Sequence, residues 1–168
     1  MKFEKVRLCK HISGNKKIVF CKKLSISMKA EHAWQQCINC EFFEPDIEKF
    51  QRILRKAWSI ETCYPREKSK WTLEKPEVGQ CFVTALVVSD YLGGKIAYNK
   101  KLDHYFNILD DGTVIDFTKE QFNDLDKIKI DIILTPETLK QNSSNDTIHR
   151  YMLLKAKVDK MIKNKLLR

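Results

Sequence analysis

Hydrophobic and polar positions follow several different spacings along the chain, and each spacing predicts a type of element. Helical spacing begins after Pro45-Asp46, with hydrophobic residues at Ile47, Phe50, Ile53, Leu54, Ala57 and Trp58. The next segment, 59–79, is polar, contains two prolines and is predicted to be a long loop. The run from Phe82 to Leu92 is hydrophobic almost all round, which is typical of a buried helix, and Gly93-Gly94 would end it.

Strand-like segments follow this helix, at 95–99, 104–109, 113–117 and 130–134. Asp110-Asp111-Gly112 lies between the second and third of them and predicts a tight hairpin turn. The tail, 147–166, is predicted to be a long helix with lysines on one face and a hydrophobic stripe on the other: Tyr151, Leu154, Val158, Met161, Ile162 and Leu166. The QNSSND sequence before it is a loop, and the first 44 residues contain only short strand-like runs such as KKIVF.

The composition narrows the class of protein without identifying its chemistry. A chain of 168 residues fits one domain, or one domain with a small appended module. No segment approaches the roughly 20 apolar residues that a membrane-spanning helix needs, and the opening MKFEKVRLCKHISGNKK lacks the apolar core of a secretory signal. We therefore expect a cytoplasmic protein with no membrane span, whose six cysteines are thiols, metal ligands or a nucleophile rather than disulfides.

The net charge of +9 is concentrated at the two ends of the chain. Residues 1–41 contain nine Lys/Arg against three Asp/Glu, and residues 150–168 contain seven against one, whereas the middle is slightly acidic. No nucleic-acid recognition motif accompanies these basic ends. The basic tail helix is expected to be a solvated face, and binding to nucleic acid is expected to be weak and non-specific at most.

Four cysteines in the first 44 residues predict a structural zinc site formed by Cys9, Cys21, Cys37 and Cys40. The last two form a C-x2-C knuckle, which commonly supplies two of the four thiolates around a zinc ion. The first two are 12 residues apart and do not form a second knuckle, and His11 could replace Cys9 as a ligand. Unrelated reduced thiols, or an iron–sulfur or redox site, remain alternatives. A segment this short and lysine-rich can bury little apolar surface, so it is expected to need a cross-link such as a bound metal ion to fold.

Three residues of the central region suggest a catalytic triad. Cys81 is predicted at the start of the buried helix, where amide N–H groups and the helix dipole favour a thiolate. The hairpin would bring His104, on its first strand, level with Asp116, near the end of its second strand. Asp116 could then hold one imidazole nitrogen while the other nitrogen meets the Cys81 thiol. Each residue also has an ordinary interpretation, as a core thiol, a structural histidine or a turn residue.

The sequence around these three residues resembles a known superfamily. Gly79-Gln80-Cys81-Phe82-Val83 is similar to the GQCWVF nucleophile motif of transglutaminases, and His104-Tyr105-Phe106-Asn107 with the later Asp-Gly and Asp116-Phe117-Thr118 resembles their H-x-W-N…D-G…D-x-T pattern. The resemblance implies an α+β fold with a papain-like or transglutaminase-like core. In such a core a buried helix packs on an antiparallel sheet and carries the cysteine of a Cys-His-Asp triad.

A closer resemblance covers residues 52–125 and the tail. The sequences RKAWSIETCYPREKSKW, GQCFVTALVVSDYLGG and HYFNILDDGTVIDFTKEQF look like those of the YunG-like family of uncharacterised bacterial proteins. The resemblance to that family implies no particular substrate, because none is established for it.

Supporting roles are open for two further residues. Gln80 could stabilise an oxyanion or could simply begin the helix, and the backbone N–H of Cys81 is the better oxyanion donor because it lies at the helix start. Trp71 could line the cleft or donate its indole N–H, or it could pack in the core. Cys63 is expected to be an ordinary buried thiol.

Together these features predict a zinc-ribbon-like module at residues 1–44 and an α+β domain at residues 45–168. The main functional hypothesis is acyl transfer from an amide through a thioester on Cys81, with a peptide, a protein or a small amide as the substrate and with water or an amine as the acceptor. The alternative is a non-catalytic zinc-containing module that binds protein or nucleic acid. Reactivity of the thiol distinguishes the two hypotheses.

Overall fold

The computed structural model describes residues 8–14, 18–29, 44–122 and 129–164, and it contains helices and antiparallel sheets in a mixed α+β arrangement. The chain divides into two compact units, one formed by residues 1–53 with 158–168 and the other by residues 54–157. The division falls inside the first long helix, whereas the sequence suggested a boundary between residues 44 and 45.

The first unit contains a small antiparallel meander of β1 (Ile12–Gly14), β2 (Ile18–Cys21) and β3 (Ile26–Lys29). Only β2 had a clear signal in the sequence, within KKIVF. Cys9 forms an isolated bridge with Pro45, just before α3 (Ile47–Ala57) begins. The Asp46 carboxylate accepts a hydrogen bond from the Lys49 N–H at 2.9 Å, so it caps the first turn of this predicted helix.

The second unit contains a four-stranded antiparallel sheet in the order β6-β5-β4-β7. Its strands are β4 (Lys95–Asn99), β5 (His104–Ile108), β6 (Val114–Ile115) and β7 (Ile132–Leu134). The predicted hairpin joins β5 to β6, and its turn is closed by a hydrogen bond from Leu109 N–H to Thr113 O at 2.9 Å. The four strands confirm the strand pattern of the sequence, although β6 is much shorter than its TVIDF segment suggests.

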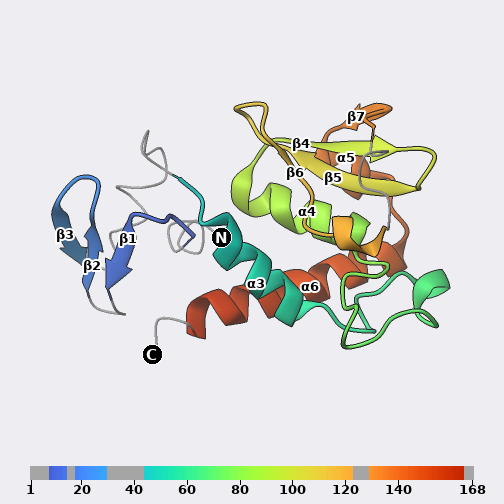
Figure 1. Cartoon of the computed structure of the whole chain (residues 1–168), viewed down its shortest axis with the longest axis horizontal. Coiled ribbons are helices and arrows are strands. Elements are labelled where there is room, and N and C mark those ends of the chain that lie inside the picture. The colour runs from blue at the N-terminus through green and yellow to red at the C-terminus, as the bar shows by residue number, and fades with distance from the viewer. Residues whose placement is uncertain (1–7, 15–17, 30–43, 123–128, 165–168) are drawn as a thin grey trace. The chain divides into compact units, whose positions relative to one another are not determined.

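Helix α4 (Cys81–Leu92) packs against β4 and β5 and provides most of the core of this unit (Figure 1). Its side chains are buried on all sides, as the continuous hydrophobic run predicts; nine of them are buried, including Val83, Leu86 and Val87. Gly93 ends the helix by donating its N–H to Ser89 O at 3.0 Å. Because the helix is buried on every side, its first residue is held in a fixed position at one end.

The predicted loop between α3 and α4 is ordered by specific hydrogen bonds and contains one short 3-10 helix, η1 (Pro65–Glu67). Trp58 donates its indole N–H to Thr84 Oγ1 on α4 at 2.9 Å, and Tyr64 donates its N–H to Gly79 O at 2.8 Å. Gly79 has φ +67°, and a Cβ there would lie 2.7 Å from Cys63 Sγ. Glycine is therefore required two residues before Cys81.

Two further helices complete the chain. Helix α5 (Pro136–Gln141), which the sequence analysis did not identify, is capped by Thr135 and has proline in its first turn. Helix α6 (Asn145–Asn164) confirms the predicted tail helix, and its part within the second unit is held to α4 by a hydrogen bond from Tyr151 to the Asp90 carboxylate, which also accepts one from Lys140 on α5. Over the ranges that the structure describes, no helix is both long and apolar enough to cross a membrane.

Candidate active site around Cys81

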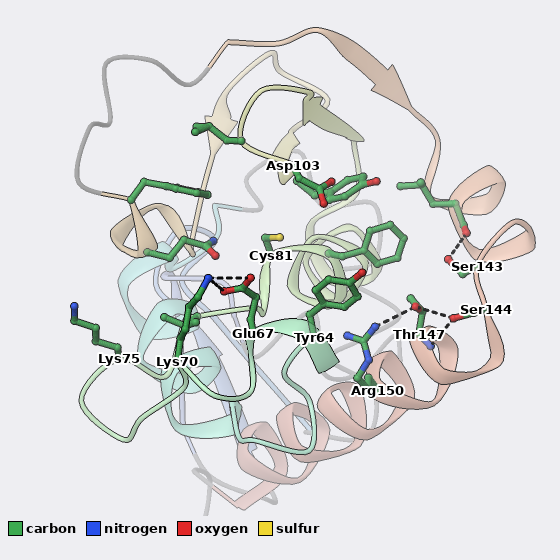
Figure 2. A pocket seen from close by; sticks show the side chains of 18 of the residues that line it. Tyr64, Glu67, Lys70, Lys75, Cys81, Asp103, Ser143, Ser144, Thr147 and Arg150 are labelled. Carbon is green, nitrogen blue, oxygen red and sulfur yellow. Dashed lines mark hydrogen bonds and ion pairs between the residues drawn. The ribbon is translucent and has the colours of Figure 1, made fainter.

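Cys81 is the first residue of α4 and lines a pocket of about 830 Å³, in which Figure 2 shows its sulfur atom. Cys9, Cys21 and Cys63 are also described by the structure, and all three are buried, whereas Cys81 is partly exposed. The first N–H groups of a helix have no partner within it, so they face the position of this thiol together with the positive end of the helix dipole.

The sheet brings His104 and Asp116 into direct contact. Asn107 pairs with Ile115, and continuing this register by one residue places Asp116 opposite Phe106, on the face of the sheet that also carries His104. His104 Nε2 lies 2.6 Å from Asp116 Oδ2, and the imidazole is fully buried. The sequence predicted this alignment from the hairpin alone.

Hydrogen bonds to the second oxygen of the Asp116 carboxylate fix its orientation. Thr118 donates its backbone N–H to Asp116 Oδ1 at 3.0 Å and its hydroxyl to the same oxygen at 3.3 Å. Since both contacts fix Oδ1, Oδ2 is directed at the imidazole, and the His104 Nε2–H donates to it. Phe106 and Phe122 pack against the ring at centroid separations of 5.7 Å and 4.7 Å.

Opposing influences act on the pKa of His104. Burial lowers the pKa of the imidazole, but hydrogen bonds with the Asp116 carboxylate and the Cys81 thiol, together with the charges of both groups, outweigh it and raise the pKa from 6.5 to about 9. Because Nε2 is occupied by Asp116, Nδ1 is the nitrogen that remains for the thiol. The three predicted triad residues are thus brought together at one end of α4.

Gln121 is a neighbour of this group to which the sequence analysis assigned no role. Its Nε2 lies 3.4 Å from His104 Nδ1 and donates to Thr118 O at 2.9 Å. It belongs to η2 (Lys119–Gln121), a single turn that directly follows the Asp116-Phe117-Thr118 sequence. A glutamine within a short polar turn carries no sequence signal that would assign it to a site.

The side chains of Gln80 and Trp71, which the sequence offered for oxyanion stabilisation, hydrogen-bond to backbone carbonyl groups of the loop instead. The Gln80 side chain is fully buried and donates to Ser59 O at 3.0 Å, while its Oε1 has no hydrogen-bond partner among the described residues. Trp71 donates its indole N–H to Pro76 O at 3.1 Å and does not line the pocket. Both side chains therefore support the loop before Cys81.

Comparison with known proteins identifies the family of this chain. The family model described as YunG protein matches residues 46–163. The chain belongs to the YunG family. It is 43% identical over 79 residues to a Bacillus subtilis (strain 168) protein described as "Uncharacterized protein YunG"; the match covers 45% of this chain and 63% of that relative. No solved structure matches the chain.

The YunG match includes Cys81, His104 and Asp116 but not the four N-terminal cysteines. Cys9 and Cys21 are buried in the first unit, whereas Cys37 and Cys40 lie outside the described residues. Within the described ranges, no group of three or more His, Cys, Asp or Glu side chains is placed to hold a metal ion. The zinc site therefore stays a prediction from the sequence.

Cys63, the other cysteine of the YunG region, lies in a different environment from the partly exposed Cys81. It is fully buried, and its Sγ donates to Val78 O and Tyr64 O at 3.3 Å and 3.4 Å. Burial, and then the negative charge of Glu67, raise the pKa of this thiol to about 11. This environment is that of an ordinary buried thiol.

Proposed function

We propose that this protein is a thiol enzyme that transfers an acyl group from an amide through a thioester on Cys81. The observation that supports the proposal is that a cysteine lining a pocket lies at a helix start next to a buried His104–Asp116 pair. This combination supplies a nucleophile, a base and a group that orients the base. It also supports the finer proposal of a papain-like or transglutaminase-like core.

The reaction proceeds in two stages. In the first stage the Cys81 sulfur attacks the amide carbonyl while His104 holds the thiol proton on Nδ1, and N–H groups at the start of α4 bind the oxyanion. The C–N bond then breaks, His104 returns the proton to the leaving amine, and a thioester remains on Cys81. In the second stage water or an amine attacks the thioester with His104 as base, and the thiol is released. Asp116 keeps the imidazole oriented throughout.

Alkylation kinetics test the proposal without a known substrate. Iodoacetamide is expected to modify Cys81 much faster than Cys63 in the folded protein, because Cys63 is buried and its thiol has a pKa of about 11. Mass spectrometry after brief exposure identifies the modified residue. His104→Gln should change the dependence of the Cys81 rate on pH, since it removes the basic nitrogen next to the sulfur.

A matched control distinguishes the local effect from a general one. His149 lies on the exposed face of α6, so His149→Gln should leave the pH profile of Cys81 unchanged. Circular dichroism checks that His104→Gln is folded, and Asp116→Asn provides a second variant that keeps the imidazole. The proposal fails if Cys81 reacts no faster than Cys63, or if neither variant changes its pH profile.

A further inference from the structure

One end of the Cys81 pocket is formed by a buried arginine from a distant part of the chain. Arg150, on α6, is only 3% exposed yet lines the pocket, and its guanidinium lies over the Tyr64 ring at 5.6 Å. Figure 2 shows it beside Tyr64 and Thr147, facing the same hollow as Cys81. Taking an arginine out of water is costly unless its hydrogen bonds and charge are matched, so each of its nitrogen atoms needs a partner.

Only one edge of this guanidinium is matched within the protein. Its Nε donates to Asp146 Oδ2 at 2.8 Å, and its Nη2 donates to Thr147 Oγ1 at 3.0 Å. Nη1, which carries two N–H groups, makes no hydrogen bond within the part of the chain that the structure describes and is not among the polar atoms sealed from solvent, so water or a ligand can reach it. A donor pair is therefore left facing the pocket.

The carboxylates of the pocket do not supply the missing acceptor. Glu67 is paired with Lys70 at 2.9 Å, Asp103 accepts from Tyr98 Oη at 2.8 Å, and Glu120 lies 3.5 Å from Arg55. Ser144 and Thr147 add hydroxyl groups beside the guanidinium, linked to each other at 3.1 Å. This end of the pocket thus offers hydroxyl groups and the remaining N–H groups of a guanidinium whose charge is paired with Asp146, and none of these three carboxylates accepts a hydrogen bond from it.

The wall of the pocket also contains four aromatic side chains: Tyr64, Phe82, Tyr105 and Phe122. Phe82 and Tyr105 form an edge-to-face pair with a centroid separation of 4.6 Å, and Tyr64 lies under the guanidinium. Aromatic faces favour an apolar or planar ligand segment. The pocket therefore presents a thiol, an aromatic wall and an end with free hydrogen-bond donors, and its volume of about 830 Å³ is large enough for a small organic molecule.

We infer that the amide substrate of Cys81 carries a carboxylate that binds Arg150 Nη1 and, on the other side of the reacting amide, a planar or apolar group that packs on the aromatic wall. This inference rests on the proposed function for the identity of the reacting amide. Binding of the carboxylate itself needs no chemical step. An acyl amino acid, either free or at the end of a peptide, has this arrangement of groups.

Protection of Cys81 from alkylation tests the inference on the unmodified protein. Hippurate and hippuramide have the same size and shape, but only hippurate carries a carboxylate. Hippurate is expected to slow the reaction of Cys81 with iodoacetamide in a saturable way, at about tenfold lower concentration than hippuramide, because a charge-assisted hydrogen bond is lost in the amide. A short peptide with a free or an amidated C terminus distinguishes a peptide end from a small acid, and protection by either acid supports the inference.

Substitution of the arginine assigns the effect to its guanidinium. Arg150→Gln should make hippurate and hippuramide equally weak, whereas Arg66→Gln, at an exposed position outside the pocket, should preserve the preference. Arg150→Lys keeps the positive charge and should retain part of the preference for hippurate. It replaces Arg150→Gln in the test if that variant does not fold. Equal protection by acid and amide in the unmodified protein overturns the inference. If His104 controls the reactivity of Cys81 but no acid protects Cys81, the inference fails and the proposed function stands. If acids protect Cys81 but His104 has no influence on its reactivity, the proposed function fails and carboxylate binding at Arg150 stands.

Discussion

His104 lies in an environment very different from that of an imidazole in water. An imidazole with no exposed surface is expected to be neutral, yet the contacts with Asp116 and Cys81 favour its charged form enough to place its pKa near 9. The buried ring therefore holds a proton more tightly in the folded protein than in the unfolded chain. Stability and reactivity at this residue are linked through the same proton.

The raised pKa of His104 predicts a pH-dependent stability. A group whose pKa rises from 6.5 to about 9 on folding contributes stability that is complete below pH 6.5 and is lost as the pH rises through 9. In Asp116→Asn the main cause of the rise is removed, so burial dominates and the pKa of His104 falls. Between pH 6.5 and 9 the free energy of unfolding should therefore decrease much less in this variant than in the unmodified protein. The two decreases should differ by a value on the order of 3 kcal/mol.

Urea unfolding at several pH values between 6 and 9 measures this difference. Asp111→Asn is the matched control because Asp111 is an exposed carboxylate in the turn of the same hairpin, and its pKa is lowered by hydrogen bonds with Thr113. That control should follow the unmodified protein over the whole range. Parallel curves for Asp116→Asn and the unmodified protein would show that the pair does not control the protonation of His104.

At the scale of elements, a close backbone approach joins the end of α4 to the hairpin. Gly94, just after the helix, has φ +81°, and a Cβ there would lie 2.2 Å from Ile108 O at the end of β5. The chain therefore passes directly against the strand that begins with His104. This contact holds the helix that carries the thiol close to the strand that carries the base.

Gly94→Ala is expected to destabilise the protein strongly. Alanine would combine an unfavourable positive φ with a direct overlap on backbone atoms, so the free energy of unfolding should fall by about 3 kcal/mol or more. Gly112→Ala provides the control, because Gly112 has φ +84° but nothing lies within 4 Å of its added Cβ. It should cost about 1 kcal/mol, from backbone strain alone. Equal losses in urea unfolding would contradict the role of the close contact.

The elements that sequence periodicity predicts are those with a long or strongly marked pattern. The buried run of α4, the Asp-Gly turn and the amphipathic tail all carry local signals, and the hairpin register then follows from counting residues. Helix α5 is only six residues long, so its capping threonine and proline were too weak a signal without a periodic face. Arg150 could not be placed in the pocket at all, because its side chain meets that of Tyr64 only through tertiary packing of α6.

At the scale of the whole molecule, the family match and the cysteine pattern divide the chain in the same way. The matched region, 46–163, contains the candidate active site, and Cys9, Cys21, Cys37 and Cys40 all precede it. The core of the second unit is formed by α4 and its sheet, neither of which involves these cysteines. A metal bound by these four cysteines would therefore stabilise the N-terminal segment without being part of the core of the second unit.

We predict about one zinc ion per chain, bound by these four cysteines, because a structural zinc commonly uses four thiolates including a C-x2-C pair. Elemental analysis of protein purified without chelator measures it. Cys40→Ser should lose the metal and unfold the N-terminal segment, while the second unit keeps its near-ultraviolet signal from Trp58. Cys63→Ser should leave the metal content unchanged. A metal-free protein with a folded N-terminal segment would exclude the site.

The close packing of Cys63 has a practical consequence for labelling. Its sulfur faces the backbone of Gly79 with no space for even a methyl group between them, so an attached dye could not be accommodated without breaking the fold. A fluorophore coupled through a maleimide should therefore enter the second unit at Cys81 alone, and no cysteine there needs to be replaced first. A dye at that position would sit in the pocket, and its emission would report directly on molecules that enter or leave.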